Sequence, residues 1–357
     1  MKILLGLSGG VDSSVAAYLL QKQGHEVTAG FMRNWEDDDG SPYCSVKEDF
    51  LDAAQVADKL NINLVQMNFA SEYKEKVFSY FLSELNRGRT PNPDIYCNKF
   101  IKFKEFTNFA FQNNYDAVAT GHYSNILKDN GNNFLAKSLD QTKDQTYFLS
   151  QIDKSLLGKI EFPLGDILKS EVRKIAEQEN LITYNKKDST GICFIGERPF
   201  PEFLNRYLPL NKGSIVDENG VEIGEHKGLY FYTIGQRQGL GIGGIKNRDE
   251  KAWYVAGKDF DQNNLIVVQD NNHPLLFSSE LKVSNINWLK QPNKKNITAK
   301  IRYRQEDQEC EIHQAEGNLY VKFKNPQRAV TPGQFIVFYE DEICLGGGEI
   351  DLSLIHI

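Results

Sequence analysis

Apolar runs alternate with helix-like patterns over roughly the first 207 residues. The apolar run at residues 3–7 predicts a short buried strand, and apolar side chains spaced by about 3.6 residues over residues 11–23 predict a helix that Gly24 ends. Strands separated by helices of this length form parallel sheets. The same alternation predicts further strands at 26–31, 63–67 and 117–120 and further helices at 49–60, 98–111 and 170–179.

The pattern changes after Leu210, where glycine becomes frequent and helical periodicity ends. Residues 213–216 and 221–224 flank Asp217-Glu218-Asn219-Gly220, which is a hairpin signal. From about residue 281, short apolar segments recur between turns, as is typical of a small β-barrel or sandwich. The predicted organisation is an α/β parallel-sheet domain at 1–208, a small central β-rich domain at 209–278 and a C-terminal β-barrel at 279–357.

A glycine- and serine-rich loop joins the first predicted strand to the first predicted helix, with the sequence Ser8-Gly9-Gly10-Val11-Asp12-Ser13-Ser14. Glycines let backbone N–H groups approach phosphate oxygens, and serine hydroxyls and a helix N-terminus add further attraction for an anion. The loop is neither a Walker A loop nor a GxGxxG fingerprint. A simpler alternative is a helix start where Ser and Asp act as caps. Asp12 fits Mg²⁺ carried with a pyrophosphate, and the loop resembles the PP-loop of ATP pyrophosphatases, which cleave ATP to AMP and pyrophosphate.

A proline-stiffened segment leads into the helix expected at 98–111. It reads Thr90-Pro91-Asn92-Pro93-Asp94-Ile95-Tyr96-Cys97-Asn98, and lysines follow within two turns. We expect Cys97 to lie beside the helix N-terminus, where the dipole and neighbouring cations favour a thiolate. Asp94, three residues earlier, is placed to move a proton. The alternative is that Cys97 is a buried structural cysteine.

A second loop has the same combination of a thiol and cations: Lys186-Lys187-Asp188-Ser189-Thr190-Gly191-Ile192-Cys193. Two such cysteines in a domain that activates a substrate with ATP indicate sulfur chemistry. Zinc fits less well, because each cluster holds one cysteine and no second ligand at metal-binding spacing. The sequence therefore predicts no protein-held metal site.

Composition limits the classes of protein. The chain has 357 residues, of which 40% are hydrophobic and 25% charged, and such a composition is ordinary for a globular protein. Its apolar runs fall short of the roughly 18 residues that span a bilayer. Five cysteines without a CxxC pair do not form a disulfide framework, and no secretory or transit segment is evident. A cytoplasmic protein without a membrane partner is expected.

The net charge of -7 argues at first against a nucleic-acid partner. Residues 282–304, however, hold seven Lys or Arg and no Asp or Glu, with Trp288 and Tyr303 between them. This pattern is typical of phosphate contacts beside aromatic platforms for bases, although a solvated edge of a β-domain is an alternative. Residues 281–357 carry ten basic and ten acidic side chains, so the negative excess belongs to residues 1–280.

Taken in order, these motifs resemble the bacterial tRNA-specific 2-thiouridylase family. The resemblance implies a PP-loop catalytic domain, a central β-domain and a C-terminal β-barrel. It also implies sulfur insertion at C2 of the wobble uridine of tRNA, with ATP and Mg²⁺, an adenylated uridine, and a persulfide supplied by a cysteine desulfurase or a sulfur-relay protein. The matching stretches cover nearly the whole chain and lie at 6–14, 31–35, 88–94, 97–98, 119–123, 143–145, 188–198, 235–237, 239–244, 302–305, 331–334 and 345–348.

The resemblance also implies roles for individual residues. Cys97 would be the catalytic nucleophile, Cys193 would carry the persulfide, the two thiols would end as a disulfide, and Asp94 would be the acid–base group. The implied ATP-binding positions are Gly6, Leu7, Ser8, Gly9, Gly10, Val11, Asp12, Ser13, Met32 and Gly121. The implied tRNA-contacting positions are Asn92, Pro93, Asp94, His122, Lys143, Asp144, Gln145, Arg302, Tyr303 and Gln334.

Two other classes of function stay open from the sequence. An amidating enzyme similar to GMP synthetase uses a related loop, but it needs an ammonia source, and the chain has no recognisable glutaminase domain. A non-catalytic tRNA-binding protein would explain residues 282–304 but not the phosphate loop with Asp94 and Cys97. Within the first class, the sequence does not choose between direct attack by the persulfide and attack by released sulfide.

Overall fold

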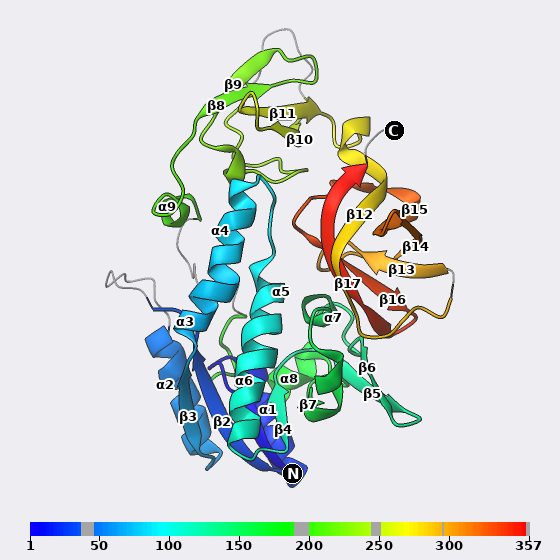
Figure 1. Cartoon of the computed structure of the whole chain (residues 1–357). Coiled ribbons are helices and arrows are strands. Elements are labelled where there is room, and N and C mark those ends of the chain that lie inside the picture. The colour runs from blue at the N-terminus through cyan, green and yellow to red at the C-terminus, as the bar shows by residue number, and fades with distance from the viewer. Residues whose placement is uncertain (37–45, 189–199, 244–250, 295, 355–357) are drawn as a thin grey trace.

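The structure is a computed structural model that describes residues 1–36, 46–188, 200–243, 251–294 and 296–354. Its strands form three sheets of five, four and eight strands. In Figure 1 the five-stranded sheet and its helices lie at the lower left, the four-stranded sheet at the top, and the C-terminal strands at the right. Among the described residues, no helix is both long and apolar enough to cross a membrane.

The five-stranded sheet is parallel and has the strand order β3-β2-β1-β4-β7. Ile3, Leu4 and Leu5 of its central strand are fully buried, because helices cover both faces of the sheet. A strand covered on both faces is a continuous apolar run, which is why the sequence predicted it. The strands are β1 (Lys2–Gly6), β2 (Glu26–Arg33), β3 (Leu64–Asn68), β4 (Ala117–Thr120) and β7 (Ile160–Glu161).

Alternate residues of β1 contact different helices, as the two-residue period of a strand requires. Ile3 and Leu5 pack with one set of helices, and Leu4 packs with the other. The first set is α1 (Val11–Lys22), α2 (Val46–Lys59) and α8 (Lys169–Gln178). The second set is α3 (Ala70–Tyr73), α4 (Ser79–Asn86), α5 (Pro93–Cys97) and α6 (Phe106–Gln112). The predicted α/β parallel-sheet domain is thus confirmed.

Two stretches of wider, π-type helix were not predicted. Lys74–Phe78 joins α3 to α4, and Asn98–Glu105 joins α5 to α6. Because of these stretches, residues 70–86 run as one long helix, and residues 93–112 run as a second that is kinked at Phe103, where φ is -116° and ψ is 17°. Both helices pack against the same face of the sheet, the face that Leu4 contacts.

The second long helix begins five residues earlier than predicted. Pro93 is its first residue, and the Ile95 N–H donates to the Asn92 side-chain oxygen at 3.4 Å, which caps the helix. Cys97 therefore lies inside a helix, and the prediction that it lies beside a helix N-terminus was wrong. The proline-containing segment starts the helix instead of ending as a loop before it.

The central sheet contains the predicted hairpin and has the strand order β10-β11-β8-β9. Its pairs are antiparallel except for β11 with β8. Its strands are β8 (Gly213–Val216), β9 (Glu222–His226), β10 (Trp253–Asp259) and β11 (Asn264–Gln269). Other short helices in the described part of the chain are α7 (Thr146–Leu149), α9 (Phe200–Leu204), and 3₁₀ turns at Lys154–Lys159, Leu229–Phe231 and Pro274–Leu276.

Six C-terminal strands close into a barrel, because the ladder β12-β15-β14-β13-β16-β17 returns to β12. Closure removes the unpaired edges that an open sheet would expose. A hairpin from the N-terminal half joins the barrel where Ala136 pairs with Ile343. The barrel strands are β12 (Phe277–Trp288), β13 (Asn296–Lys300), β14 (Gln308–Ala315), β15 (Asn318–Arg328), β16 (Phe335–Glu340) and β17 (Ile343–Leu354), and the hairpin strands are β5 (Asn125–Asp129) and β6 (Asn132–Ala136).

All three parts of the chain meet at the segment that precedes α5. Lys258 of the central sheet donates from Nζ to the Gly88 carbonyl at 3.1 Å. The Thr90 N–H donates to the Pro332 carbonyl at 2.9 Å, and Gln334 donates from Nε2 to the Thr90 carbonyl at 2.8 Å. The position at which α5 starts is therefore set by contacts with both β domains.

Arg89 fills the space between α4 and β17. Its guanidinium lies 2.6 Å from Glu84 Oε2, 2.7 Å from Asp351 Oδ1 and 3.5 Å from Glu349 Oε2. It also donates to the Ile350 carbonyl at 3.2 Å. The side chains of Glu84 and Glu349 are only 5% and 4% exposed, so Arg89 compensates two buried carboxylates from different domains.

We expect Arg89→Met to lower the free energy of unfolding by about 3–5 kcal/mol, because it leaves buried carboxylates without their cation. Arg87→Met is the matched control. Arg87 lies 3.3 Å from the same Glu84, but its side chain is 71% exposed, so we expect a loss under about 1 kcal/mol. Urea unfolding of both variants measures the difference. Equal losses in the two variants would contradict the assignment.

Candidate functional site

The predicted phosphate loop lies between β1 and α1, where the sequence placed it. Gly9 has a φ of +75°, and a Cβ atom there would lie 2.3 Å from the Asp49 carbonyl oxygen, so the loop requires glycine. The Ser8 and Ser13 hydroxyls lie 3.1 Å apart. Gly10 is the N-cap of α1 and has no side chain to cap the amides of the first turn. A helix N-terminus of this kind, with two hydroxyls beside it, is suited to an anion.

Further residues of the predicted ATP set lie around the same loop. A Cβ atom at Gly121 would lie 2.7 Å from the Ser13 backbone nitrogen, so the chain after β4 packs directly on the start of α1. A Cβ atom at Gly6 would lie 3.2 Å from the end of the Met32 side chain. The structure therefore brings together positions that are more than 100 residues apart in the sequence.

Asp12 makes contacts that the sequence analysis missed. Lys169 Nζ lies 2.7 and 2.8 Å from its two carboxylate oxygens, and the Tyr123 hydroxyl donates to Oδ1 at 2.8 Å. Burial, with the Asp12 charge beside it, raises the pKa of Tyr123. The sequence did contain a signal for Lys169, since a cation at the start of a helix opposes the helix dipole. Within the described residues, no group of three or more potential metal ligands occurs, and Asp12 supplies one carboxylate.

Asp94 and Cys97 lie one turn apart on α5. Cys97 is 2% exposed and belongs to the core between the sheet and the long helices. Burial raises the pKa of the Asp94 carboxyl, and the positive charge of Lys102 partly offsets this effect. A carboxyl with a raised pKa exchanges protons more readily near neutral pH. Cys193 lies outside the described residues, so its pairing with Cys97 stays a prediction.

Two of the cations that flank Cys97 in the sequence, Lys99 and Arg89, are engaged in other contacts. Lys99 Nζ donates to Gln151 Oε1 at 3.2 Å, and burial lowers the pKa of this lysine. Arg89 is held by its carboxylates. The sequence predicted several cations that favour a Cys97 thiolate, but the structure directs these two side chains to other partners.

His122, an expected tRNA contact, is 9% exposed. Its Nδ1 lies 2.8 Å from the Thr120 hydroxyl, and its ring lies 5.9 Å from Phe103 and 6.3 Å from Phe162 between ring centroids. Burial, and secondarily the charge of Lys102, hold its pKa well below 6.5. His122 is thus a neutral side chain inside the domain and is not presented at the surface.

The expected tRNA loop at 143–145 contains one accessible charge. Lys143 is half-buried and lies 2.8 Å from Asp188 Oδ2. Asp144 is 5% exposed and accepts from the Thr146 hydroxyl at 2.6 Å. Gln145 Oε1 accepts from the Tyr123 N–H at 2.9 Å. Asp144 and Gln145 therefore fix the loop, and Lys143 is its charged outer residue.

The barrel brings its own expected contacts next to this loop. Tyr303 packs on Phe148 with ring centroids 4.5 Å apart. Arg302 is exposed and donates to the Ala329 carbonyl at 2.8 Å. Gln334, through its bond to Thr90, lies at the segment before α5. Residues expected to contact tRNA thus come from the α/β domain and the barrel where the two domains touch.

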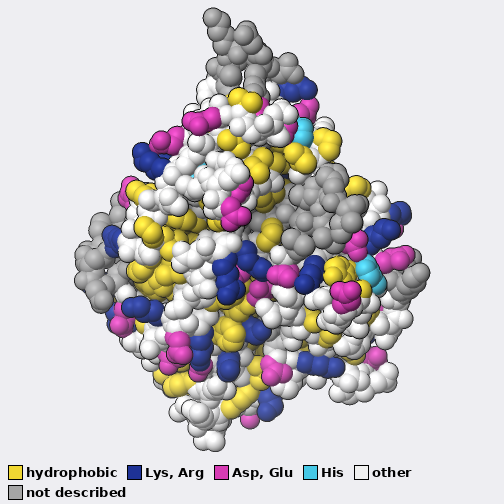
Figure 2. Space-filling view, turned by 45° about the horizontal axis from the view of Figure 1, so that its top comes forward, with side chains coloured by type: hydrophobic (Ala, Val, Ile, Leu, Met, Phe, Trp, Pro, Cys, Tyr) yellow, Lys and Arg dark blue, Asp and Glu magenta, His cyan; other side chains and the backbone are white. Residues whose placement is uncertain are grey.

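Four of the six described cations in the basic stretch at 282–304 lie beside carboxylates. Barrel closure places acidic residues of β16, β17 and the neighbouring turns beside it, and Figure 2 shows cationic and anionic side chains interspersed on the face displayed. The ion pairs are Lys282–Asp351 at 3.6 Å, Lys290–Glu340 at 2.9 Å, Lys294–Asp341 at 2.6 Å and Lys300–Asp307 at 3.4 Å. The separation of charge along the sequence is therefore largely cancelled in space.

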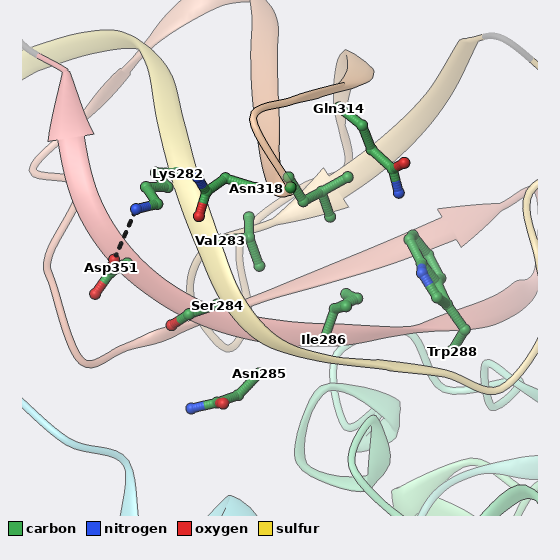
Figure 3. Close-up of a pocket in the computed structure, with 11 residues that line it drawn as sticks. Lys282, Val283, Ser284, Asn285, Ile286, Trp288, Gln314, Asn318 and Asp351 are labelled. Carbon is green, nitrogen blue, oxygen red and sulfur yellow. Dashed lines mark ion pairs between the residues drawn. The ribbon is translucent and has the colours of Figure 1, made fainter.

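Two cavities lie at the barrel, away from the phosphate loop. One of about 220 Å³ lies between β12 and the β14–β15 turn, with the Lys282–Asp351 pair at one end and Trp288 at the other (Figure 3). The other, of about 410 Å³, lies between α4 and the barrel and is lined in part by Tyr80 and Arg87. The described residues that line them belong to neither the expected ATP set nor the expected tRNA set.

Comparison with protein-family models divides the chain into three consecutive matches. They are the tRNA methyl transferase HUP domain at residues 1–197, the tRNA methyl transferase PRC-barrel domain at 201–269 and the aminomethyltransferase beta-barrel domain at 278–350. These ranges correspond to the α/β part, the central sheet and the barrel of the structure.

Curated relatives match along the whole chain. The "tRNA-specific 2-thiouridylase MnmA" of Francisella tularensis subsp. mediasiatica (strain FSC147) is 53% identical over 354 residues, which are 98% of this chain and 99% of the relative. The protein of the same name from subsp. novicida (strain U112) is 53% identical over 355 residues, 98% of this chain and 99% of the relative. Among solved structures, a 4-thiouridine synthetase–RNA complex with bound ATP has 18% identity and a TM-score of 0.36, and the match covers 57% of this chain and 49% of that chain.

The parallel α/β domain with its SGGVDS loop, followed by a small β-sheet and a closed barrel, defines a PP-loop protein of the tRNA-modifying class. Within that class, the chain belongs to the tRNA-specific 2-thiouridylase (MnmA/TrmU) family.

The buried imidazole of His122 predicts a pH dependence of stability. Its folded pKa lies below the unfolded value of 6.5, so the unfolded chain takes up a proton that the folded chain refuses as the pH falls below 6.5. Relative to His122→Gln, the wild type should lose up to about 1.4 kcal/mol of unfolding free energy per pH unit in that window. Urea unfolding between pH 7.5 and 5.5 measures this, and parallel curves for the two proteins would contradict it.

Proposed function

We propose that this protein is a tRNA-uridine 2-sulfurtransferase that replaces O2 of the wobble uridine with sulfur and converts ATP to AMP and pyrophosphate. The main support is the full-length identity of 53% to relatives named tRNA-specific 2-thiouridylase. The geometry agrees with it, because the phosphate loop and the Asp94–Cys97 helix belong to the same sheet domain and the barrel contacts the segment before that helix.

The first chemical step is activation of the base. Uridine O2 attacks the α-phosphorus of ATP held at residues 8–13, and pyrophosphate leaves. Mg²⁺ would neutralise phosphate charge there, with Asp12 as the carboxylate of the loop. Asp94 then serves as the acid–base group for the flipped base, and its raised pKa suits this role. Extraction of the base fits recognition of a single-stranded anticodon loop.

The second step is transfer of sulfur. The terminal sulfur of a Cys193 persulfide adds to C2, and Cys97 then attacks the Cys193 sulfur, so that a Cys97–Cys193 disulfide forms and the transferred sulfur stays on C2. In the alternative order, Cys97 attacks the persulfide first and releases sulfide, which adds to C2. AMP leaves with the former O2 in both orders, and an external reductant of the thiol class restores the two cysteines.

For the three parts of the chain, we assign catalysis to residues 1–208, tRNA contact to the barrel at 279–357, and support of the segment before α5 to residues 209–278. Tyr303 and Gln334 support the assignment of the barrel, because Tyr303 packs on Phe148, just after the 143–145 loop, and Gln334 bonds to the Thr90 backbone. The expected cytoplasmic location and a persulfide donor protein belong to the same proposal.

A methyl transferase is the second candidate, because two of the matching family models carry that description. The phosphate loop favours sulfur transfer. A glycine-rich turn with two hydroxyls at a helix N-terminus binds phosphate, and methyl donors of the S-adenosylmethionine class contain no phosphate.

The test is an incubation of the full chain with ATP, Mg²⁺, unmodified tRNA and a cysteine desulfurase with cysteine, followed by nucleoside analysis. We expect 2-thiouridine and AMP in equal amounts. Cys97→Ser should abolish the product, and Asp94→Asn should slow it by about 10²–10⁴-fold. Cys310→Ala is the matched control, since Cys310 is a buried cysteine of the barrel core.

Each failure has a distinct meaning. Methylated or amidated nucleosides without 2-thiouridine would favour the other enzyme classes. Binding of tRNA with no new nucleoside would favour a non-catalytic protein. Full activity of Cys97→Ser would remove this residue from the mechanism.

A further inference from the structure

A chain of ion pairs extends from the phosphate loop into a neighbouring region that the expected ATP set does not include. Lys169, the first residue of α8, contacts both oxygens of Asp12 at 2.7 and 2.8 Å and Asp188 Oδ1 at 2.8 Å. Asp188 also forms ion pairs with Lys143, whose Nζ lies 2.8 Å from Oδ2, and with Arg173, whose guanidinium lies 3.0 Å from Oδ1. Three cations from two separate segments thus converge on one carboxylate next to the loop.

The position of Lys169 is not explained by the stability of its helix. A cation in the first turn of a helix opposes the helix dipole. The side chain is also only 11% exposed, and ordering a lysine side chain costs rotamer entropy. Both effects are unfavourable, yet the ammonium group is held where it contacts Asp12, the second residue of α1.

The location of the ammonium group points to a phosphate. Asp12 lies in the first turn of α1, so Lys169 Nζ is held beside the same helix N-terminus that Gly9, Gly10 and Ser13 prepare for an anion. An ammonium forms charge-assisted hydrogen bonds with phosphate oxygens. Tyr123, just after β4, also contacts this group. Its hydroxyl donates to Asp12, and its ring centroid lies 5.8 Å from Lys169 Nζ.

Asp188 keeps Lys169 in this place. Partial burial acts to raise its pKa, but hydrogen bonds from Lys143 and Lys169 hold the pKa at about 2. The carboxylate is therefore charged at all working pH values. Asp140 adds a fixed point at the backbone, because it accepts the Lys169 N–H at 3.0 Å.

We propose that Lys169 binds the polyphosphate of ATP and that Asp188 is the residue that positions it. The inference rests on the proposed use of ATP, but not on the identity of the transferred atom.

The experiment is calorimetric titration of the full chain with α,β-methylene-ATP and Mg²⁺, which separates binding from turnover. We expect Lys169→Met to weaken binding by about tenfold or more, which corresponds to about 1.4 kcal/mol. Lys169→Arg should retain most of the affinity, and Asp188→Asn should lose several-fold. Lys174→Met is the matched control, because Lys174 is exposed on the same helix, and its affinity should equal that of the wild type.

Kinetics of 2-thiouridine formation add a second readout. Lys169→Met should raise KM for ATP while KM for tRNA stays within about twofold, which a general loss of folding would not produce. Where Lys169→Met folds poorly, Lys169→Gln keeps a hydrogen-bond donor without the charge. Wild-type affinity of Lys169→Met or Lys169→Gln for the analogue overturns the inference. Tight analogue binding by a wild type that makes no 2-thiouridine leaves the inference standing and overturns only the proposed function.

Discussion

The arrangement of the chain depends on the compensation of buried carboxylates by Arg89. Glu84 belongs to α4 and Glu349 to β17, and their side chains are nearly inaccessible to water. Without a cation between them, the α/β domain and the barrel could meet only by desolvating two like charges. Because Arg89 adjoins Thr90, whose backbone is bonded to Pro332 and Gln334, the same docking fixes where α5 begins. The places of Asp94 and Cys97 follow from that start.

Burial around α5 then shifts several titratable groups toward their neutral forms. It raises the pKa of Asp94 and lowers those of Lys99 and His122. The pKa of the acid rises and those of the bases fall, but each shift favours the neutral form, because desolvation penalises charge of either sign. The raised pKa of Asp94 is thus a product of the packing that also encloses Cys97. Burial of the side chains around α5 therefore both builds the core there and shifts the pKa values of its titratable groups.

The sequence predicted most of what periodicity and local chemistry determine. Four of the five strands of the parallel sheet and the phosphate loop were predicted, because an apolar run and a glycine turn carry their own signals, whereas the two-residue strand β7 was not predicted. The start of α5 was missed although Asn92 and Pro93 are a standard helix start, since prolines there were read as a loop. The Lys169–Asp12 contact joins residues 157 positions apart, so the sequence showed the unusual cation at the start of α8 but not its partner. The π-type stretches have i→i+5 hydrogen bonds, so they depart from the 3.6-residue period on which the helix predictions were based.

The charged residues show most clearly why the order of residues along the sequence does not predict the charge of the folded surface. The cations of residues 282–304 stand apart from acids along the chain, yet barrel closure pairs four of them with carboxylates. An RNA phosphate that approaches such a lysine must compete with a carboxylate already in place, so each contact releases less free energy than contact with an unpaired lysine. The paired cations of residues 282–304 therefore add little general attraction for RNA. Weak general attraction favours discrimination, because unrelated RNA gains little by binding.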